Sequence, residues 1–284
     1  MTQQEQMKLV LLYSLNELGG GEQRKHVLQY INDHNYWYKN DQNDVLRATR
    51  NEIAWRNDFS FERQHLVEHG FMKKNGNGRW EITEAGIIEL DLLLEKCRNI
   101  KQNEYHCFTL DFFKKLYSIQ NFNESAEDQQ LIEEISQMVC NPTDTQLNLV
   151  NAPMPKGQKL QSGDKKNVYK RDPKVSKRAL SRAGHVCEID STHKSFLRRN
   201  SNNLYMEPHH LVPMSFTDYF GVNLDREQNI FSLCSHCHNQ IHYGTKEDVR
   251  TLITQLFLSR QYEICSILGR DINLDELFQI YNVK

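Results

Sequence analysis

YMEPHHLVPMSFTDYFGVNLDREQNIFSLCSHCHNQIHYG, residues Tyr205–Gly244, is the stretch that decides the fold. It combines a histidine pair, an asparagine and two spaced pairs of metal-capable side chains, namely His209-His210, Asn229, Cys234-x-x-Cys237 and His238-x-x-x-His242. Imidazole and thiolate are the ligands that zinc and other transition metals prefer in proteins. A density this high in so short a stretch predicts a metal-dependent centre.

Two short strands and a helix should present these side chains. Tyr205–His209 and Ile230–Leu233 are expected to be strands, and a helix should begin near Ser235. Because four residues make about one helical turn, His238 and His242 should lie on the same face of that helix.

This stretch resembles the HNH, or ββα-metal, nuclease family, and within it the branch of bacterial restriction endonucleases. The resemblance covers about Arg171–Gly244 and is carried by His209-His210-x-x-Pro213, by Asn229 before a strand, and by Cys234-x-x-Cys237-His238-x-x-x-His242. It implies a catalytic role for each matching position: His209, His238 and His242 bind the catalytic cation, His210 is the general base, and Asn229 pins the loop that orients the base.

The chemistry of phosphodiester hydrolysis suits these residue types. An imidazole is partly neutral near pH 7, so it can take a proton from water. A single divalent cation clamps the phosphate and stabilises the departing 3′ oxygen. Neutral imidazoles favour zinc, nickel or manganese over magnesium. The family accepts several cations, so the catalytic ion is left open among Mg²⁺, Mn²⁺ or a similar metal.

A structural zinc ion is the second expected metal. Cys234 and Cys237 are half of such a site, which needs four ligands. Where a second Cys-x-x-Cys would stand, the chain reads Cys187-Glu188-Ile189-Asp190, a departure from the usual pattern. We expect Cys187 and His193 to complete a Cys3His site, with Asp190 as the alternative to His193. A small ββα unit needs such a staple because it buries little apolar area.

Residues 1–96 should form a DNA-reading domain. Helices are expected over Arg47–Trp55 and Glu62–His69, then a hairpin around Asn75-Gly76-Asn77-Gly78 and a helix capped by Thr83. The stretches NEIAWRNDFSFERQHLVEHGFM and GRWEITEAG resemble the winged-helix module found at the N-terminus of some restriction endonucleases.

That resemblance implies how DNA would be held. The helical region between Arg47 and His69 should enter the major groove, and cations of the wing should meet phosphates, namely Lys73, Lys74 and Arg79. The alternative is a winged helix that serves only protein contacts.

The middle of the chain divides by composition. Residues 97–140 should be a helical extension, with helices over Phe108–Tyr117 and Leu131–Val139 and no evident chemistry. Residues 141–170 should be a basic linker, because Pro and Gly break any periodicity there.

A cluster of cations follows this change in composition. Residues 156–182 contain ten Lys or Arg against Asp164 and Asp172. Such an excess is expected to bind a phosphate backbone, with Lys170 and Arg171 among the contacts, or else to be a solvated linker. Arg182 and His185 could contact the scissile phosphate or only pack the helix that carries them.

Composition sets the remaining expectations. The 284 residues fit about two domains, and a net charge of −2 means that DNA binding would have to be local. Seven cysteines, an odd number, favour a metal site over disulfides. No apolar run of about 18 residues indicates a membrane span, so a cytoplasmic protein is expected. Apolar helices over Asp248–Ser259, Tyr262–Leu268 and Leu274–Tyr281 should brace the core, or join two chains.

The sequence therefore predicts an α+β chain with an N-terminal winged helix and a zinc-stapled HNH nuclease domain over 171–284, including flanking C-terminal helices. The expected function is metal-dependent cleavage of double-stranded DNA in a bacterial restriction system by a homodimer. Cleavage would either depend on modified bases or be sequence-specific beside a separate methyltransferase. A DNA-binding regulator with a degenerate nuclease fold is the alternative from another class.

Overall fold

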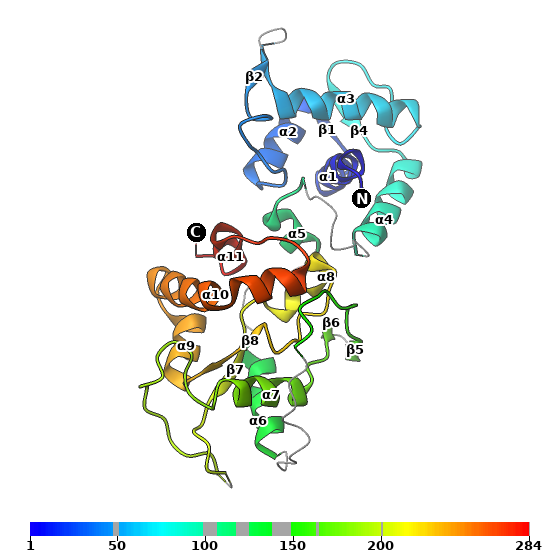
Figure 1. The fold of residues 1–284 in the computed structure, drawn as a ribbon. Coiled ribbons are helices and arrows are strands. Elements are labelled where there is room, and N and C mark those ends of the chain that lie inside the picture. Colours follow the sequence, from blue (N-terminus) through cyan, green and yellow to red (C-terminus); the bar gives the residue numbers. More distant parts are fainter. Residues whose placement is uncertain are drawn as a thin grey trace. The chain divides into compact units, whose positions relative to one another are not determined.

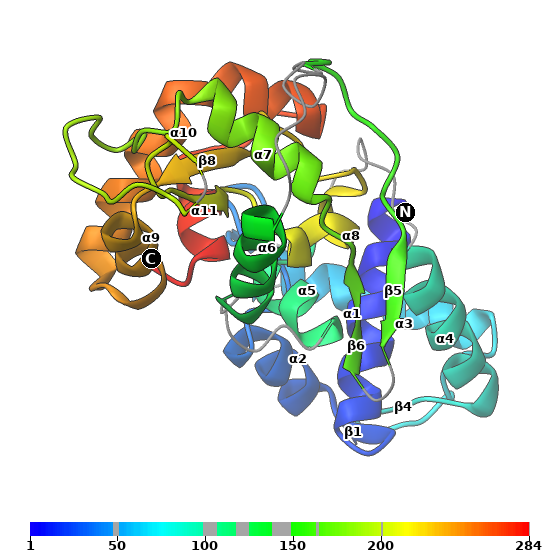
Figure 2. The same ribbon diagram turned by 90° about the horizontal axis from the view of Figure 1, so that it is seen from below.

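The computed structural model describes residues 1–47, 51–98, 107–117, 125–137, 149–162, 165–199 and 201–283. Over these residues the chain is a mixture of helices and small antiparallel two-stranded sheets, which is the expected α+β class (Figures 1 and 2). It divides into two compact units. The first is Met1–Ile100 with Glu104–Gln120, and the second is Lys101–Asn103 with Asn121–Lys284.

The first unit packs helices around a helical core. Its elements are α1 (Gln3–Glu17), β1 (Gly21–Gln23), α2 (Arg24–Asp33), β2 (Leu46–Arg47), β3 (Glu52–Ile53), α3 (Ala54–Glu68), β4 (Arg79–Glu81), α4 (Glu84–Arg98) and α5 (Leu110–Leu116). Helix α1 contacts α2, α3 and α4 through fully buried side chains such as Leu9 and Leu12. Burial of these side chains supplies the main stabilisation of the unit.

The expected hairpin is present. Strand β4 pairs with β1, with Gly21 opposite Glu81, and Met72 forms a bridge with Ile82. Its turn uses left-handed backbone at Asn77 (φ 57°) and Gly78 (φ 72°), the conformation that Asn and Gly tolerate best. The hairpin with β4, and then α4, follow α3 in the order that the sequence predicts.

The prediction of two helices between Arg47 and His69 was wrong. Leu46–Arg47 and Glu52–Ile53 pair as strands, and one uninterrupted helix, α3, follows. Trp55, Phe59 and Leu66 explain why the helix continues. They recur at helical spacing and are at most 1% exposed, so a single face carries the burial through the whole segment.

The middle of the chain contains the two helices predicted there, but they fall in different units. Helix α5 belongs to the first unit, whereas α6 (Ser125–Gln137) belongs to the second. Within the expected linker, β5 (Lys159–Ser162) pairs antiparallel with β6 (Lys165–Tyr169). Residues 141–148 of that predicted linker lie outside the described residues.

The second unit is built on the strand, loop, strand and helix that the Tyr205–Gly244 stretch predicts. Its further elements are α7 (Pro173–Arg182), β7 (Glu207–His210), the 3-10 helix η2 (Met214–Phe216), α8 (Thr217–Phe220), β8 (Ile230–Leu233), α9 (Ser235–Tyr243), α10 (Lys246–Leu268) and α11 (Leu274–Ile280). Strands β7 and β8 are antiparallel, with His209 opposite Phe231 and His210 opposite Ile230.

The tail closes the second unit. Helix α10 packs on α9 and α11, and it is broken only at Arg260 (φ −135°), between the two helices expected there. None of the described helices has the length and hydropathy needed to cross a membrane.

Candidate functional site

Four side chains from three separate elements meet in the second unit. His209 comes from the end of β7, His238 and His242 from one face of α9, and Asp128 from α6; one ligand atom of each lies within 4.8 Å of the others. The Nε2 atoms of His238 and His242 are 3.2 Å apart. Oδ2 of Asp128 lies 3.4 Å from Nε2 of His242 and 3.7 Å from Nε2 of His238. Ligands bound to one ion at about 2.1 Å stand about 3.0–3.4 Å from each other, so this group fits a cation.

Neighbouring groups select the nitrogen that each histidine can offer. Oε2 of Glu207 lies 2.7 Å from Nδ1 of His238, so Nδ1 donates to the carboxylate and Nε2 is the nitrogen that a cation would take in exchange for a proton. The hydroxyl of Tyr281 donates to the Leu211 carbonyl at 2.8 Å and therefore accepts from Nε2 of His209 at 3.0 Å. His209 is left with a lone pair on Nδ1, which has no hydrogen-bond partner among the described residues. Outer partners of this kind orient metal ligands in known sites.

The electrostatics of the cluster favour a bound positive charge. Burial, together with the charges of His238 and His242, holds the pKa of His209 well below its usual range, so that this imidazole is neutral. Burial also opposes a charge on His238, but Asp128 and Glu207 outweigh it and raise the pKa to about 9. A proton and a cation exclude one another on Nε2 of His238, because a ligand must be deprotonated.

His210 lies beside this cluster and has the partners of a general base. Its Nε2 is 2.9 Å from Oδ1 of Asp225, its side chain is 0% exposed, and its Nδ1 has no hydrogen-bond partner among the described residues. Asp225 is itself fixed, because its Oδ2 accepts from the backbone N–H of Asp172 at 2.6 Å. A neutral imidazole that donates to a carboxylate retains a basic nitrogen on its other side.

The side chain of Asn229 ties together the loop between β7 and β8. Its Oδ1 accepts from the backbone N–H of Val212 at 2.8 Å, and its Nδ2 donates to the carbonyls of Val212 at 2.7 Å and Leu224 at 2.9 Å. All three bonds are buried, where losing one is costly. The asparagine thereby fixes both ends of the loop that carries Asp225.

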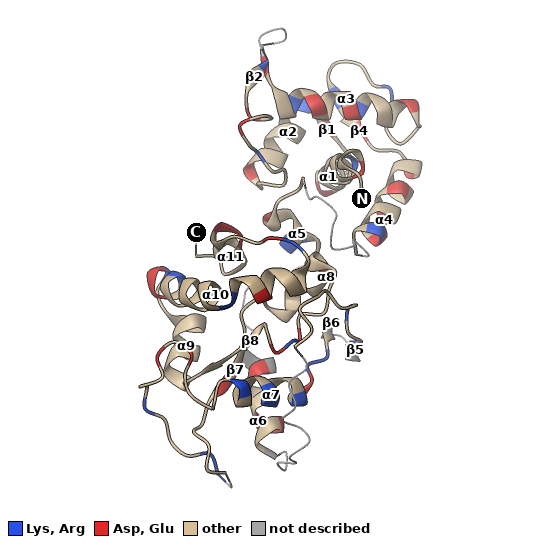
Figure 3. Ribbon diagram, viewed as in Figure 1, with Lys and Arg blue, Asp and Glu red and all other residues tan. Residues whose placement is uncertain are grey.

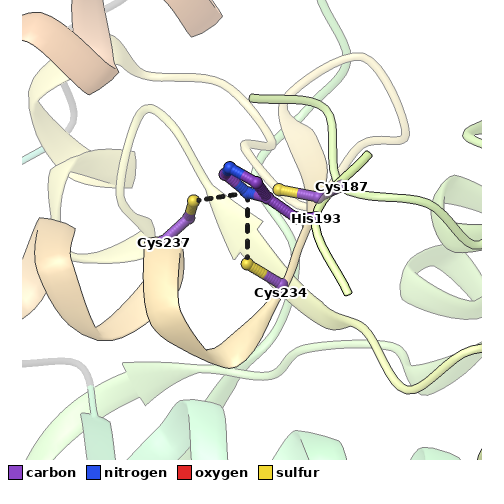
Figure 4. A group of neighbouring side chains, drawn as sticks. All are labelled: Cys187, His193, Cys234 and Cys237. Carbon is purple, nitrogen blue, oxygen red and sulfur yellow. Dashed lines mark hydrogen bonds between the residues drawn. The ribbon is translucent and has the colours of Figure 1, made fainter. Parts of the chain in front are cut away.

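A second group of metal-capable side chains joins the loop after α7 to the start of α9. Cys187, His193, Cys234 and Cys237 bring one ligand atom each within 4.8 Å of the others (Figure 4). Nδ1 of His193 is 3.3 Å from Sγ of Cys237 and 3.6 Å from Sγ of Cys234. Sulfur and nitrogen ligands on one tetrahedral zinc stand about 3.6 Å apart, so the spacing suits zinc.

The structure brings His193 to the three sulfurs and leaves Asp190 outside that group. Oδ2 of Asp190 lies 3.7 Å from Nε2 of His193, the nitrogen that faces away from the sulfurs. Burial opposes ionisation of Cys187, but backbone hydrogen bonds from Cys234 and Asp190 help to lower its pKa. Donors of this sort favour a thiolate, which is the form that binds metal.

Much of the basic segment is used inside the second unit. Arg171 pairs with Asp128 and its side chain is 7% exposed. The other pairs are Arg178 with Glu227 at 2.6 Å, Arg182 with Glu263 at 2.6 Å, and both Lys156 and Lys159 with Asp218 at 3.1 Å and 2.8 Å. Acidic residues distant in sequence thus pair with five of the ten cations expected to bind a phosphate backbone, while Lys170 is exposed; DNA contacts of Lys170 and Arg171 stay a prediction. Figure 3 marks in blue the Lys and Arg positions along the ribbon of α7.

The three cations of the hairpin that were expected to contact phosphates differ in whether an acidic side chain lies beside them. Lys73 pairs with Glu81, and Nε of Arg79 lies 3.7 Å from the same carboxylate. Lys74 is exposed. One acid thus offsets part of the positive charge that the sequence places on this ribbon.

Comparison with known proteins finds similarity to parts of restriction proteins. Residues 4–90 match the Mrr N-terminal domain family. The chain is also 32% identical over 92 residues to the "Type IV methyl-directed restriction enzyme EcoKMcrA" of Escherichia coli (strain K12). That alignment covers 32% of this chain and 30% of the relative. The chain therefore spans less than a third of the curated relative that it matches.

Proposed function

We propose that this protein is a metal-dependent DNA endonuclease of a restriction system, with an HNH centre in the second unit. The observation that carries the proposal is the meeting of His209, His238 and His242 in one cluster. Beside this cluster lies a candidate general base, His210, hydrogen-bonded to the carboxylate of Asp225. The HNH resemblance assigns these histidines the same roles. The similarity to a restriction enzyme supports DNA as the substrate.

Each residue has a distinct part in the proposed reaction. His209, His238 and His242 would hold the cation, which supplies charge stabilisation at the phosphate and at the leaving oxygen. His210 takes a proton from water through Nδ1, and Asp225 stabilises the resulting imidazolium. The water oxygen bonds to phosphorus while the bond to the 3′ oxygen breaks, and that oxygen is protonated from solvent. Asn229 keeps the loop of Asp225 in register with His210.

The first unit is proposed to be the DNA reader. The order α1, β1, α2, α3 and a hairpin, with the short β2–β3 pair before α3, supports a winged helix, and residues 4–90 match the Mrr N-terminal domain. Helix α3 would then enter the major groove, with Lys74 on the wing near a phosphate. The relative is named methyl-directed, which favours the version that cuts modified DNA over the version paired with a separate methyltransferase. A homodimer would place two centres on the two strands of a duplex.

The proposal is tested by digestion of matched plasmids that are unmodified, adenine-methylated, cytosine-methylated or hydroxymethylated, each with Mg²⁺, Mn²⁺ or Ni²⁺. Cleavage of one modified plasmid, abolished by a chelator and restored by the cation, is the expected result. His236→Ala is the control for an alanine substitution at a cluster histidine such as His238, because His236 is exposed on α9 and lies outside the cluster. The control should cut like the wild type. Failure to cut any plasmid with any of these cations would overturn the nuclease assignment.

A further inference from the structure

Asp128 reaches the histidine cluster from a helix that the HNH motif does not include. It lies on α6, which packs against α7 and β7, and it is 2% exposed. One carboxylate oxygen faces His238 and His242 at 3.7 Å and 3.4 Å, and the other accepts from the guanidinium of Arg171. An anion is therefore held between the cation-binding histidines and a buried arginine.

A phosphate would need this same position. A catalytic zinc-like site keeps one place open for substrate, and three histidines leave one place around a tetrahedral ion. Asp128 fills that place. Nη1 of Arg171 donates to Oδ1 of Asp128. A guanidinium binds carboxylates and phosphates alike, so a phosphate oxygen could take the place of that carboxylate oxygen.

The surroundings show a site that substrate cannot enter as it stands. The side chain of His210 is 0% exposed and His209 is 2% exposed. The cavity that opens beside the cluster, about 320 Å³, is lined by Asp128 and Glu133 of α6, by Glu207 of β7 and by His238 and His242 of α9. While α6 is seated, the carboxylate of Asp128 therefore stands between this cavity and the histidines.

We propose that Asp128 occupies the binding position of the scissile phosphate and that DNA displaces it, together with α6, before cleavage. This inference rests on the proposed nuclease function. The guanidinium of Arg171 then donates to the phosphate instead of to the carboxylate of Asp128, so Arg171 contacts the substrate directly. Helix α6 is a competitor built into the chain, and the apparent affinity for DNA is lowered by the fraction of molecules in which it is seated.

The first test measures the affinity of the full-length protein, with its structural zinc bound and no catalytic cation added, for inorganic phosphate by calorimetry. Asp128→Asn keeps the size of the side chain and removes its charge, so phosphate should bind about tenfold more tightly than to the wild type. Glu134→Gln is the control, because it makes the same charge change at an exposed position of the same helix. An equal gain in both variants, or no gain in Asp128→Asn, would overturn the proposal.

The second test needs no change at Asp128. In a His210→Ala protein, which binds without cutting, addition of Mn²⁺ and a duplex oligonucleotide should speed amide hydrogen exchange in 125–137 as α6 leaves. Unchanged or slower exchange there would mean that Asp128 stays in place as a ligand.

The Asp128→Asn variant gives one more outcome against the proposal. A loss of Mn²⁺ affinity without any gain in phosphate affinity would also mean that Asp128 is a permanent ligand of the cation.

Cleavage assays separate this inference from the function on which it rests. If wild-type protein cuts DNA and Asp128→Asn cuts faster at limiting DNA, both stand. If the wild type cuts and Asp128→Asn does not, the nuclease stands and the displacement fails. If neither cuts under any condition, the nuclease assignment fails, while the phosphate titration still decides whether Asp128 and phosphate compete.

Discussion

The two metal-capable clusters of the second unit contain four donors each but differ in chemistry. Cys187, His193, Cys234 and Cys237 offer three soft sulfurs and one nitrogen, a closed set suited to zinc. The other cluster offers three imidazoles and one carboxylate oxygen, and its outer partners are Glu207, Tyr281 and Arg171. Thiolate ligands hold zinc permanently. The carboxylate of Asp128, which also pairs with the buried Arg171, can be exchanged for another anion. The comparison teaches that the number of donors alone does not distinguish a structural metal site from a catalytic one.

The largest effect is expected at the closed cluster. Replacing Cys234 by Ala removes one of four ligands, and binding of structural zinc contributes on the order of 10 kcal/mol in small zinc domains. Since whole domains are stable by only about 5–15 kcal/mol, the second unit should fail to fold. Zinc content by mass spectrometry and the thermal melting curve measure the outcome. Cys265→Ala, a cysteine outside the cluster, should keep both unchanged.

An unchanged melting temperature in Cys234→Ala would mean that the fold does not depend on the cysteine cluster, any more than on the histidine cluster. The cysteines would then be core residues, and the contrast between staple and reacting centre would be lost.

The next largest effect should be confined to chemistry. In His210→Ala the general base is absent, and a positioned base contributes about 10²–10⁴-fold to rate. Cleavage should fall by that factor, while zinc content and affinity for a duplex remain as in the wild type. Single-turnover cleavage and fluorescence anisotropy measure the two quantities. Full activity in this variant would remove His210 from the mechanism, because among the described residues the imidazole that bonds to Asp225 is that of His210.

The difference between the clusters also explains what the sequence could predict. Cys234 and Cys237 form one Cys-x-x-Cys pattern, and His209, His238 and His242 follow from strand-end and one-turn spacing. Local periodicity fixes such positions, so the strand, loop, strand and helix were predicted correctly. Whether each residue performs its assigned role stays a prediction.

Residues brought from a distance could not be found in this way. Asp128 and Tyr281 lie far from the motif in sequence, and no pattern of spacing connects them to it. Asp225 was the exception that could have been noticed, as an acid in the loop before Asn229. The basic segment failed for the converse reason: composition counts cations but does not show that Arg178 and Arg182 meet Glu227 and Glu263.

A smaller effect is expected from the carboxylate behind the reacting centre. Glu207→Gln retains a polar side chain but removes the charge that holds Nδ1 of His238 as a donor. Losing such an outer partner lowers metal affinity about 10–100-fold. Titration calorimetry with Mn²⁺ should show this loss, and zinc in the other cluster should stay bound. Glu134→Gln, an exposed change of the same type, should leave Mn²⁺ affinity as it is.

Equal Mn²⁺ affinity in Glu207→Gln and wild type would mean that His238 needs no carboxylate to orient it. Zinc lost along with Mn²⁺ would show that the clusters are not independent.

The smallest effect should come from Tyr281, whose hydroxyl connects His209 to the Leu211 carbonyl. Tyr281→Phe removes one neutral partner, and a neutral hydrogen bond contributes about 0.5–1.5 kcal/mol. Because about 1.4 kcal/mol is a factor of ten, Mn²⁺ affinity should fall by about 2–10-fold, less than in Glu207→Gln. Tyr262→Phe, at a side chain that is 76% exposed, is the matched control. A loss as large as that of the carboxylate variant would contradict this ranking, since it would make a neutral hydroxyl as strong an orienting group as a buried charge.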